Sequence, residues 1–194
     1  VESGRVAGCL ALIARGEKVA YFKTWGHRDR EKEIAMTDDT IFRIYSMSKP
    51  ITSVAVMQLV EQGKLKLDDP VSKYLPSLKE PKVLAGKTVE ETEEARREIT
   101  VRDLLRHTSG LTYGFFGNTP VDQSYRRNRI LGETTIEQTV KKLGKIPLLH
   151  QPGSRWHYSV STDVLGRLVE VVSKERFDKY LAAHIFRPLK MTDT

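Results

Sequence analysis

The sequence predicts a fold of the α/β class in its α+β form, with an antiparallel hairpin first and mainly helices and loops after it. Two patterns predict this. Residues 6–14 (VAGCLALIA) and 18–25 (KVAYFKTW) are β-rich runs joined by the turn-like RGEK. From about Ser46 onward, apolar residues recur at helical spacing in several segments. The 194 residues, 39% hydrophobic and 29% charged, suffice for one ordinary domain, or for a domain and part of another.

The first β-rich run is almost continuously apolar, which is typical of a strand buried on both faces. A two-stranded hairpin cannot bury such a strand by itself. We therefore expect the C-terminal strands of the fold to be absent, and the chain to be the front portion of a larger protein. The single cysteine, Cys9, lies in this run as an expected core residue and permits no internal disulfide, so the redox compartment stays open.

No apolar run is long enough to span a bilayer, and no signal peptide is visible. The chain does not begin with methionine, so a removed leader remains open and the localisation is unknown, with cytoplasmic favoured over periplasmic. The net charge of +7 raises the question of nucleic acid. The basic residues are scattered, however, and acidic residues in 90–98 offset the densest cluster at 125–129. We expect no nucleic-acid partner.

The central helix is predicted from about Ser46 to Gln62, with Gly63 ending it and Pro50 tolerated in its first turn. Its broad apolar side is expected to consist of Val54, Met57, Leu59 and Val60. No clear linker follows. We group residues 1–65 as the hairpin and helix of an α/β part, and residues 66–194 as a mainly helical part.

The remaining segments follow from turn and cap signals. Residues 67–81 are turn-rich, and Thr100 with Asp103 predicts a capped start for a short helix within 99–108. Residues 115–128 are expected to form a loop.

The C-terminal third is expected to be helical. Thr134 and Glu137 are expected to form a capping box ahead of a helix that contains Ile136, Val140 and Leu143. Two further amphipathic helices are expected at 161–174 and 176–186.

The stretch SMSK places Lys49 three residues after Ser46, at the start of the central helix. This spacing has two interpretations: an N-cap serine beside a solvated lysine, or a nucleophile beside its base. A serine hydroxyl needs a base, and lysine acts as one only when its pKa is lowered from about 10.4. A tyrosine can share the task, and Tyr158 in RWHYSVSTDVLG is the candidate, although a loop tyrosine beside Trp156 is more often a packing residue.

Other chemistries find little support. The five histidines show no metal-ligand spacing, so no metal site is expected, and His107 is expected to be structural. No GxSxG elbow exists, and GKT at 86–88 lacks the first glycine of a P-loop.

Taken together, the motifs resemble those of the serine β-lactamase-like hydrolases, which include class C β-lactamases, D,D-peptidases and carboxylesterases. The matching stretches are residues 11–26, 41–76 (with SMSK), 99–111 (ITVRDLLRHTSGL), 152–170 (with HYSV) and 185–194. The resemblance implies an antiparallel sheet flanked by helices plus an all-helical region. It implies that Ser46 is the nucleophile and that Lys49 and Tyr158 together take its proton. Tyr158, helped by Lys49, is then expected to protonate the leaving alcohol and to activate water, with the Ser46 backbone N–H in the oxyanion hole. No cofactor is implied.

Two departures from the family pattern matter. Val160 stands where β-lactamases carry an asparagine that contacts the substrate's amide, which favours esters over lactams. The family's third motif, on the strand that lines the oxyanion hole, is absent from this sequence.

We therefore expect a serine carboxylesterase that forms an acyl-enzyme and takes short acyl chains. One alternative is a β-lactamase or a D,D-peptidase, and a second is a catalytically silent relative that binds peptides or protein partners. The expected partner is a small-molecule ester or lactam. Phe115, Phe116, Trp156 and Val160 are candidate walls of the substrate pocket, and the oligomeric state is open.

Overall fold

The computed structural model describes residue 1 and residues 3–132 and 134–194. These residues separate into two units, 1–45 and 46–192, each of which is described by itself. The division places the central helix with the helical unit, whereas the sequence grouped it with the hairpin. Among the described residues, no helix is both long enough and apolar enough to cross a membrane.

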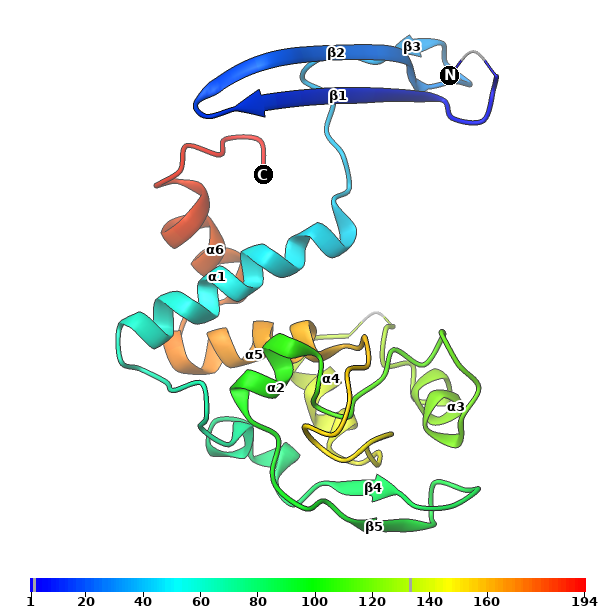
Figure 1. Ribbon diagram of the computed structural model, residues 1–194, viewed down its shortest axis with the longest axis vertical. Helices are drawn as coiled ribbons and strands as arrows, with labels where there is room; N and C mark the ends of the chain where they lie inside the picture. The colour runs from blue at the N-terminus through cyan, green and yellow to red at the C-terminus, as the bar shows by residue number, and fades with distance from the viewer. Residues whose placement is uncertain (2, 133) are drawn as a thin grey trace. The chain divides into compact units, whose positions relative to one another are not determined.

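The first unit is the expected hairpin, extended by one short strand (Figure 1). Strand β1 (Gly8–Arg15) pairs antiparallel with β2 (Lys18–Asp29) and meets it from Gly8 opposite Gly26 to Arg15 opposite Lys18. The register shifts once, between Ile13 and Ala14. Strand β3 (Ile34–Ala35) pairs with the far end of β2.

The expected burial of the first strand on both faces is wrong in this structure. Leu12 and Ile13 of β1 are 54% and 59% exposed, and Val19, Tyr21 and Phe22 of β2 are exposed as well. The physical reason is that the described residues of the first unit form the three strands and no α-helix, so its sheet has no second layer within the unit.

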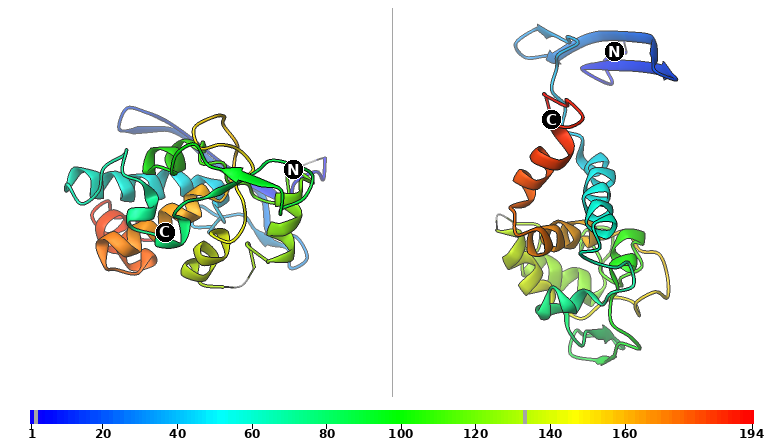
Figure 2. Two further views of the ribbon diagram at one scale, coloured as in Figure 1. Left: turned by 90° about the horizontal axis from the view of Figure 1, so that it is seen from below. Right: turned by 90° about the vertical axis from the view of Figure 1, so that its left-hand side faces the viewer.

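The second unit consists of helices with one small sheet (Figure 2). Its α-helices are α1 (Ser48–Glu61), α2 (Val101–Arg106), α3 (Pro120–Arg127), α4 (Ile136–Leu143), α5 (Ser161–Ser173) and α6 (Phe177–Leu181). Helix α6 continues into a π-helical segment, Ala182–Phe186. Short 3-10 turns lie at Tyr45–Met47, Val71–Lys73 and Pro76–Leu78, and strands β4 (Lys82–Leu84) and β5 (Thr92–Glu94) pair antiparallel.

Helix α5 is the centre of this unit, because it contacts α1, α2, α4 and α6. Its buried residues Val164, Leu165 and Leu168 meet Val56 and Leu59 of α1 in one continuous core. The predicted apolar side of α1 is partly wrong. Thr52, Ala55, Val56 and Leu59 face the core, whereas Val54 and Met57 are exposed. Thr52 and Ala55 were missed because the prediction looked for large apolar side chains.

Capping explains where the short helices begin. The predicted box of Thr100 and Asp103 is present at α2. Helix α3 lies where a loop was expected: Thr119 caps it, Asp122 completes the box, and Pro120 occupies its first position.

Helix α4 starts one residue later than expected. Thr135 and Gln138 form its box rather than Thr134 and Glu137. The Glu137 carboxylate instead pairs with Lys141 at 2.6 Å and with Arg167 at 3.3 Å.

Candidate active site

Ser46 lies in the 3-10 turn Tyr45–Met47 that leads into α1, two residues before the helix begins. The preceding residue, Tyr45, has a φ of +43°, a left-handed conformation that a residue with a side chain rarely adopts. Such strain costs on the order of 1–3 kcal/mol and persists only where the surroundings impose it. The turn therefore presents an exposed serine at the positive end of the α1 dipole.

Ser46, Lys49 and Tyr158 meet within the second unit. The Tyr158 hydroxyl lies 2.7 Å from Ser46 Oγ, and the Lys49 ammonium donates to the same oxygen at 3.1 Å. Lys49 Nζ is also 4.7 Å from the centre of the Tyr158 ring. Tyr158 reaches Ser46 because it lies just before the start of α5, and α5 packs against α1. A pair one helical turn apart and a residue distant in sequence thus converge on one hydroxyl.

A second tyrosine, Tyr113, adjoins the lysine from the other side. Lys49 Nζ is 5.6 Å from the Tyr113 ring centre, and the rings of Tyr113 and Tyr158 lie 5.3 Å apart. Burial alone would lower the pKa of Lys49, but hydrogen bonds with Tyr158 and Tyr113 outweigh burial and raise the pKa above its usual value. The ammonium therefore keeps its charge near neutral pH.

The pKa values of the two phenols shift in opposite directions. Partial burial would raise the pKa of Tyr158, but its hydrogen bonds with Lys49 and Ser46 prevail and lower it. Burial dominates at Tyr113 and raises its pKa, against the opposing effect of Lys49. The phenol nearer the serine is thus the one that ionises more easily.

His107 supports the ring of Tyr158. Its own ring centre lies 4.8 Å from that of Tyr158, and its backbone is left-handed at the end of α2. The Ser159 N–H donates to His107 Nδ1 at 3.3 Å, which makes Nδ1 an acceptor and assigns the ring proton to Nε2. Burial and the charge of Lys49 lower the pKa of His107, so the ring is neutral at pH 7.

Three buried serine hydroxyls, of Ser109, Ser159 and Ser161, form a chain of hydrogen bonds that begins directly after Tyr158 in the sequence. The Ser159 and Ser161 hydroxyls lie 2.7 Å apart, and Ser161 is 2.8 Å from Ser109. The three serines link the turn after α2 to the start of α5, which fixes the backbone on both sides of Tyr158.

The proposed pocket residues divide into two groups. Trp156 stacks on Tyr158 with ring centres 6.1 Å apart, and Phe116 lies 6.2 Å from the same ring. Phe115 packs on Tyr113 at 5.2 Å. All three side chains are exposed, and each contacts Tyr158 or Tyr113. Val160 is 0% exposed and belongs to the core, so its side chain does not line this surface.

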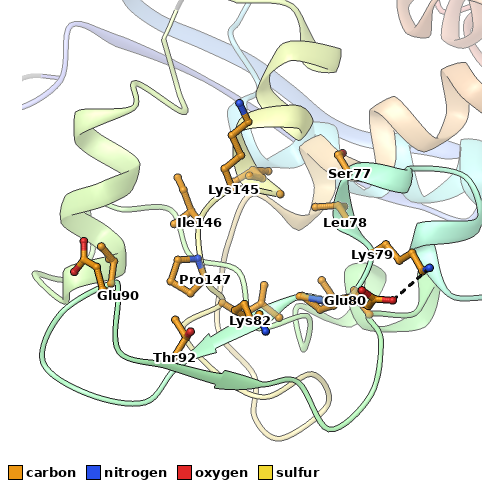
Figure 3. Close-up of a pocket in the computed structure, with 16 residues that line it drawn as sticks. Ser77, Leu78, Lys79, Glu80, Lys82, Glu90, Thr92, Lys145, Ile146 and Pro147 are labelled. Carbon is orange, nitrogen blue, oxygen red and sulfur yellow. Dashed lines mark ion pairs between the residues drawn. The ribbon is translucent and has the colours of Figure 1, made fainter.

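Two of the several concavities in the second unit are candidates for a substrate pocket. One, of about 260 Å³, includes Tyr113 and Phe115 in its lining. The other, of about 310 Å³, lies among residues 77–82, strand β5 and the end of α4, and holds the Lys79–Glu80 ion pair of 3.3 Å (Figure 3). Of these two, the first adjoins the candidate active site, because its lining includes Tyr113, which contacts Lys49 and Tyr158, whereas the second contains no residue of that group.

Tyr113 was missed by the sequence reasoning. It lies two residues after the motif HTSGL, but no local periodicity or spacing relates it to Lys49, which is 64 residues earlier. Only the packing of the segment after α2 against the start of α1 reveals the contact.

Comparison with known proteins gives a consistent result. A family model described as Beta-lactamase matches residues 1–194. Esterase EstB of Burkholderia gladioli is 34% identical over 194 residues, which cover 97% of this chain and 47% of EstB. Lovastatin esterase of Penicillium rubens is 33% identical over 202 residues, which cover 100% of this chain and 50% of that protein. The chain thus spans about half the length of the curated relatives it matches.

Among solved structures, one of EstCE1, described as "a hydrolase with promiscuous acyltransferase activity", superposes with a TM-score of 0.85 at 37% identity. The match covers 97% of this chain and 48% of EstCE1. This likeness confirms the predicted fold class.

Proposed function

The chain belongs to the Beta-lactamase family, and from this premise we propose that it acts as a serine hydrolase that cleaves carboxylic esters through an acyl-enzyme. The observation that carries the proposal is the approach of both Tyr158, at 2.7 Å, and Lys49, at 3.1 Å, to the exposed Ser46 hydroxyl. A nucleophile with a base in hydrogen-bond reach, and a third group that orients the base, is the arrangement that covalent catalysis requires.

We assign the base to Tyr158 alone, and not to Lys49 and Tyr158 together as the sequence suggested, because the raised pKa of Lys49 keeps it a cation. With Tyr158 ionised, the 2.7 Å contact has the Ser46 hydroxyl donating to the phenolate, which takes the proton as Ser46 Oγ attacks the ester carbonyl. The lowered pKa of Tyr158 and the raised pKa of Lys49 both favour this assignment. The carbonyl oxygen becomes an oxyanion, for which we assign the Ser46 backbone N–H as one donor.

The proton then passes to the leaving group. As the tetrahedral intermediate collapses, the Tyr158 hydroxyl protonates the departing alkoxide, and the acyl group remains on Ser46. In the second half-reaction the Tyr158 phenolate takes a proton from water, which attacks the acyl carbonyl and releases the acid. Ser46 recovers its proton from Tyr158. Each of these proton transfers runs through Tyr158, with Lys49 as the neighbouring cation.

Esters are favoured over lactams for two reasons. The relatives reported above include two named esterases. The position of the β-lactamase asparagine holds Val160, which is fully buried and offers no polar group to an amide side chain of a substrate. We expect short acyl chains, and a weak reaction with penicillins at most.

Intact-mass spectrometry after brief exposure to 4-nitrophenyl acetate tests the proposal. We expect a mass gain of one acetyl group that disappears in Ser46→Ala. The matched control is Ser48→Ala, because Ser48 lies two residues away, is exposed, and has no side-chain hydrogen bond to any described residue. Acetylation that survives Ser46→Ala would refute the assignment of the nucleophile.

Repeating the experiment with a penicillin, and comparing its turnover with that of the ester, separates the alternatives. A penicillin that is turned over faster than the ester would favour a β-lactamase, and a long-lived penicilloyl adduct would favour a D,D-peptidase. A protein that reacts with neither reagent would be a silent binding relative.

A further inference from the structure

The concavity beside Tyr113 carries an inference about the substrate. We propose that this concavity is a subsite for one arm of the ester substrate, and that Arg129 at its edge selects arms that end in a carboxylate. The inference rests on the proposed ester hydrolysis, since it names the substrate class of the same site.

The concavity has the size and lining of a small apolar subsite. Its volume is about 260 Å³, slightly below the range of about 300–1,000 Å³ typical of pockets for drug-sized ligands. The rings of Tyr113 and Phe115 line it together with Ile130 and Leu131. Such a lining binds a short alkyl or aryl arm by removing its apolar surface from water.

The concavity adjoins the reacting atoms through a shared wall. The Tyr113 ring lines it and stands 5.3 Å from the Tyr158 ring, whose hydroxyl is 2.7 Å from Ser46 Oγ. Phe115 extends the wall by packing on Tyr113. An ester whose carbonyl lies at Ser46 can therefore direct one arm across the Tyr113 ring into the concavity.

Two arginines border this space, and one of them is already occupied. Arg126 donates to the carbonyl oxygens of Gly114 and Gly117 and, at 2.6 Å, to Asn118 Oδ1. Its guanidinium therefore serves to hold the loop that carries Phe115. Neutralising it would disturb the wall of the concavity rather than ligand recognition alone.

Arg129 differs, because its guanidinium has no ion pair or hydrogen bond with any residue that the structure describes. Arg129 is exposed and has a left-handed backbone conformation (φ +49°). Its carbonyl oxygen accepts from the Gly132 N–H, which closes the turn that contains Ile130. The Asp122 carboxylate on α3 is buried and accepts from Thr112 and Thr119, so it does not neutralise this cation. A guanidinium at an apolar edge suits the two oxygens of a carboxylate.

Two pairs of substrates test the inference. The first pair is the mono-4-nitrophenyl ester of adipic acid and 4-nitrophenyl hexanoate, which place the charge on the acyl arm or omit it. The second is 4-acetoxybenzoate and 4-methylphenyl acetate, which do the same for the alcohol arm. We expect one charged ester to exceed its neutral partner in kcat/KM, which also identifies the arm that enters the subsite.

The matched variants are Arg129→Gln and Arg127→Gln, because Arg127 changes the net charge equally but does not line the concavity. We expect Arg129→Gln to lower kcat/KM for the preferred charged ester by about tenfold or more, as a charge-assisted pair allows. Its kcat/KM for the neutral ester, and the rates of Arg127→Gln, should stay within about twofold of the parent.

The outcomes separate the two levels of the proposal. Equal turnover of charged and neutral esters, or equal losses in both variants, would overturn the subsite while leaving the esterase proposal in place. No turnover of any of the four esters would overturn the proposed function together with the subsite. Retained selectivity in Arg129→Lys but not in Arg129→Gln would show that the cation itself makes the selection.

Discussion

Replacing Asp103 with asparagine tests what holds the turn behind the candidate active site. The carboxylate is 4% exposed and accepts hydrogen bonds from Arg97 at 2.5 and 2.9 Å. It also accepts from the Thr100 N–H at 3.0 Å and from the hydroxyls of Thr100 and Thr108 at 2.7 and 2.9 Å. One charge therefore fixes both the start of α2 and the turn after it, which contains His107.

The magnitude follows from the pKa of this carboxyl group. Burial would raise the pKa, but the hydrogen bonds from Arg97, Thr100 and Thr108 lower it from 3.8 to about 2. The shift of roughly 1.8 units, at about 1.36 kcal/mol per unit, corresponds to about 2.5 kcal/mol of stability from the ionised form. Because the folded-state pKa is the lower one, this contribution is fully present above about pH 4. It is lost as the pH falls towards 2.

Urea unfolding followed by circular dichroism measures the effect. We expect Asp103→Asn to lower the free energy of unfolding by about 2–3 kcal/mol at pH 7, and by much less near pH 2. The matched control is Asp68→Asn, since Asp68 also pairs with an arginine through both oxygens, at 2.7 and 2.9 Å, but its side chain is 75% exposed. Water replaces that contact, so the loss should be small. Equal losses in the two variants, or a loss independent of pH, would refute the reasoning.

Three further predictions concern the tyrosines and their support. The kcat/KM for a neutral ester should rise with pH as Tyr158 ionises, at a pKa below 10.0. It should fall as Lys49 loses its proton, at a pKa above 10.5. A pH profile without the rise would count against Tyr158 as the base. In Tyr113→Phe, Lys49 loses a hydrogen bond that raises its pKa, so the alkaline limb should move to lower pH, and an unmoved limb would contradict this role. Gly114→Ala should lower the free energy of unfolding by about 1–3 kcal/mol. The reason is that φ at Gly114 is +83° and an added Cβ would lie 2.6 Å from Tyr125 Cβ. The control Gly63→Ala, with φ +68° and open space, should cost less.

The parts of the site that depend on local sequence could be predicted. Ser46 and Lys49 are one helical turn apart, so their proximity follows from the spacing alone once a helix is expected there. The cap of α2 was equally local, since Thr100 and Asp103 satisfy each other's backbone groups. Tyr158 was first a candidate as a tyrosine just before a helix, and the resemblance to a family motif then gave it a role; no spacing relates it to Ser46.

The parts that depend on tertiary packing could not be predicted. Tyr113 approaches Lys49 only because the segment after α2 folds back on α1, and no pattern within either segment encodes that approach. Val160 was expected in the pocket, but the turn into α5 directs it into the core. Helix α3 illustrates a local signal that was overlooked, because Thr119, Pro120 and Asp122 together mark a helix start.

The arrangement of the two phenols gives the site a direction for proton transfer. Both tyrosines adjoin the same ammonium, so the charge of Lys49 alone does not distinguish them. Burial distinguishes them: it raises the pKa of Tyr113, whereas Tyr158 has a lowered pKa and the contact with Ser46. Paired titratable groups whose environments separate their pKa values commonly mark acid and base roles. We infer that Tyr113 keeps its proton and orients Lys49, and that Tyr158 exchanges its proton with Ser46 because it is the more acidic of the two.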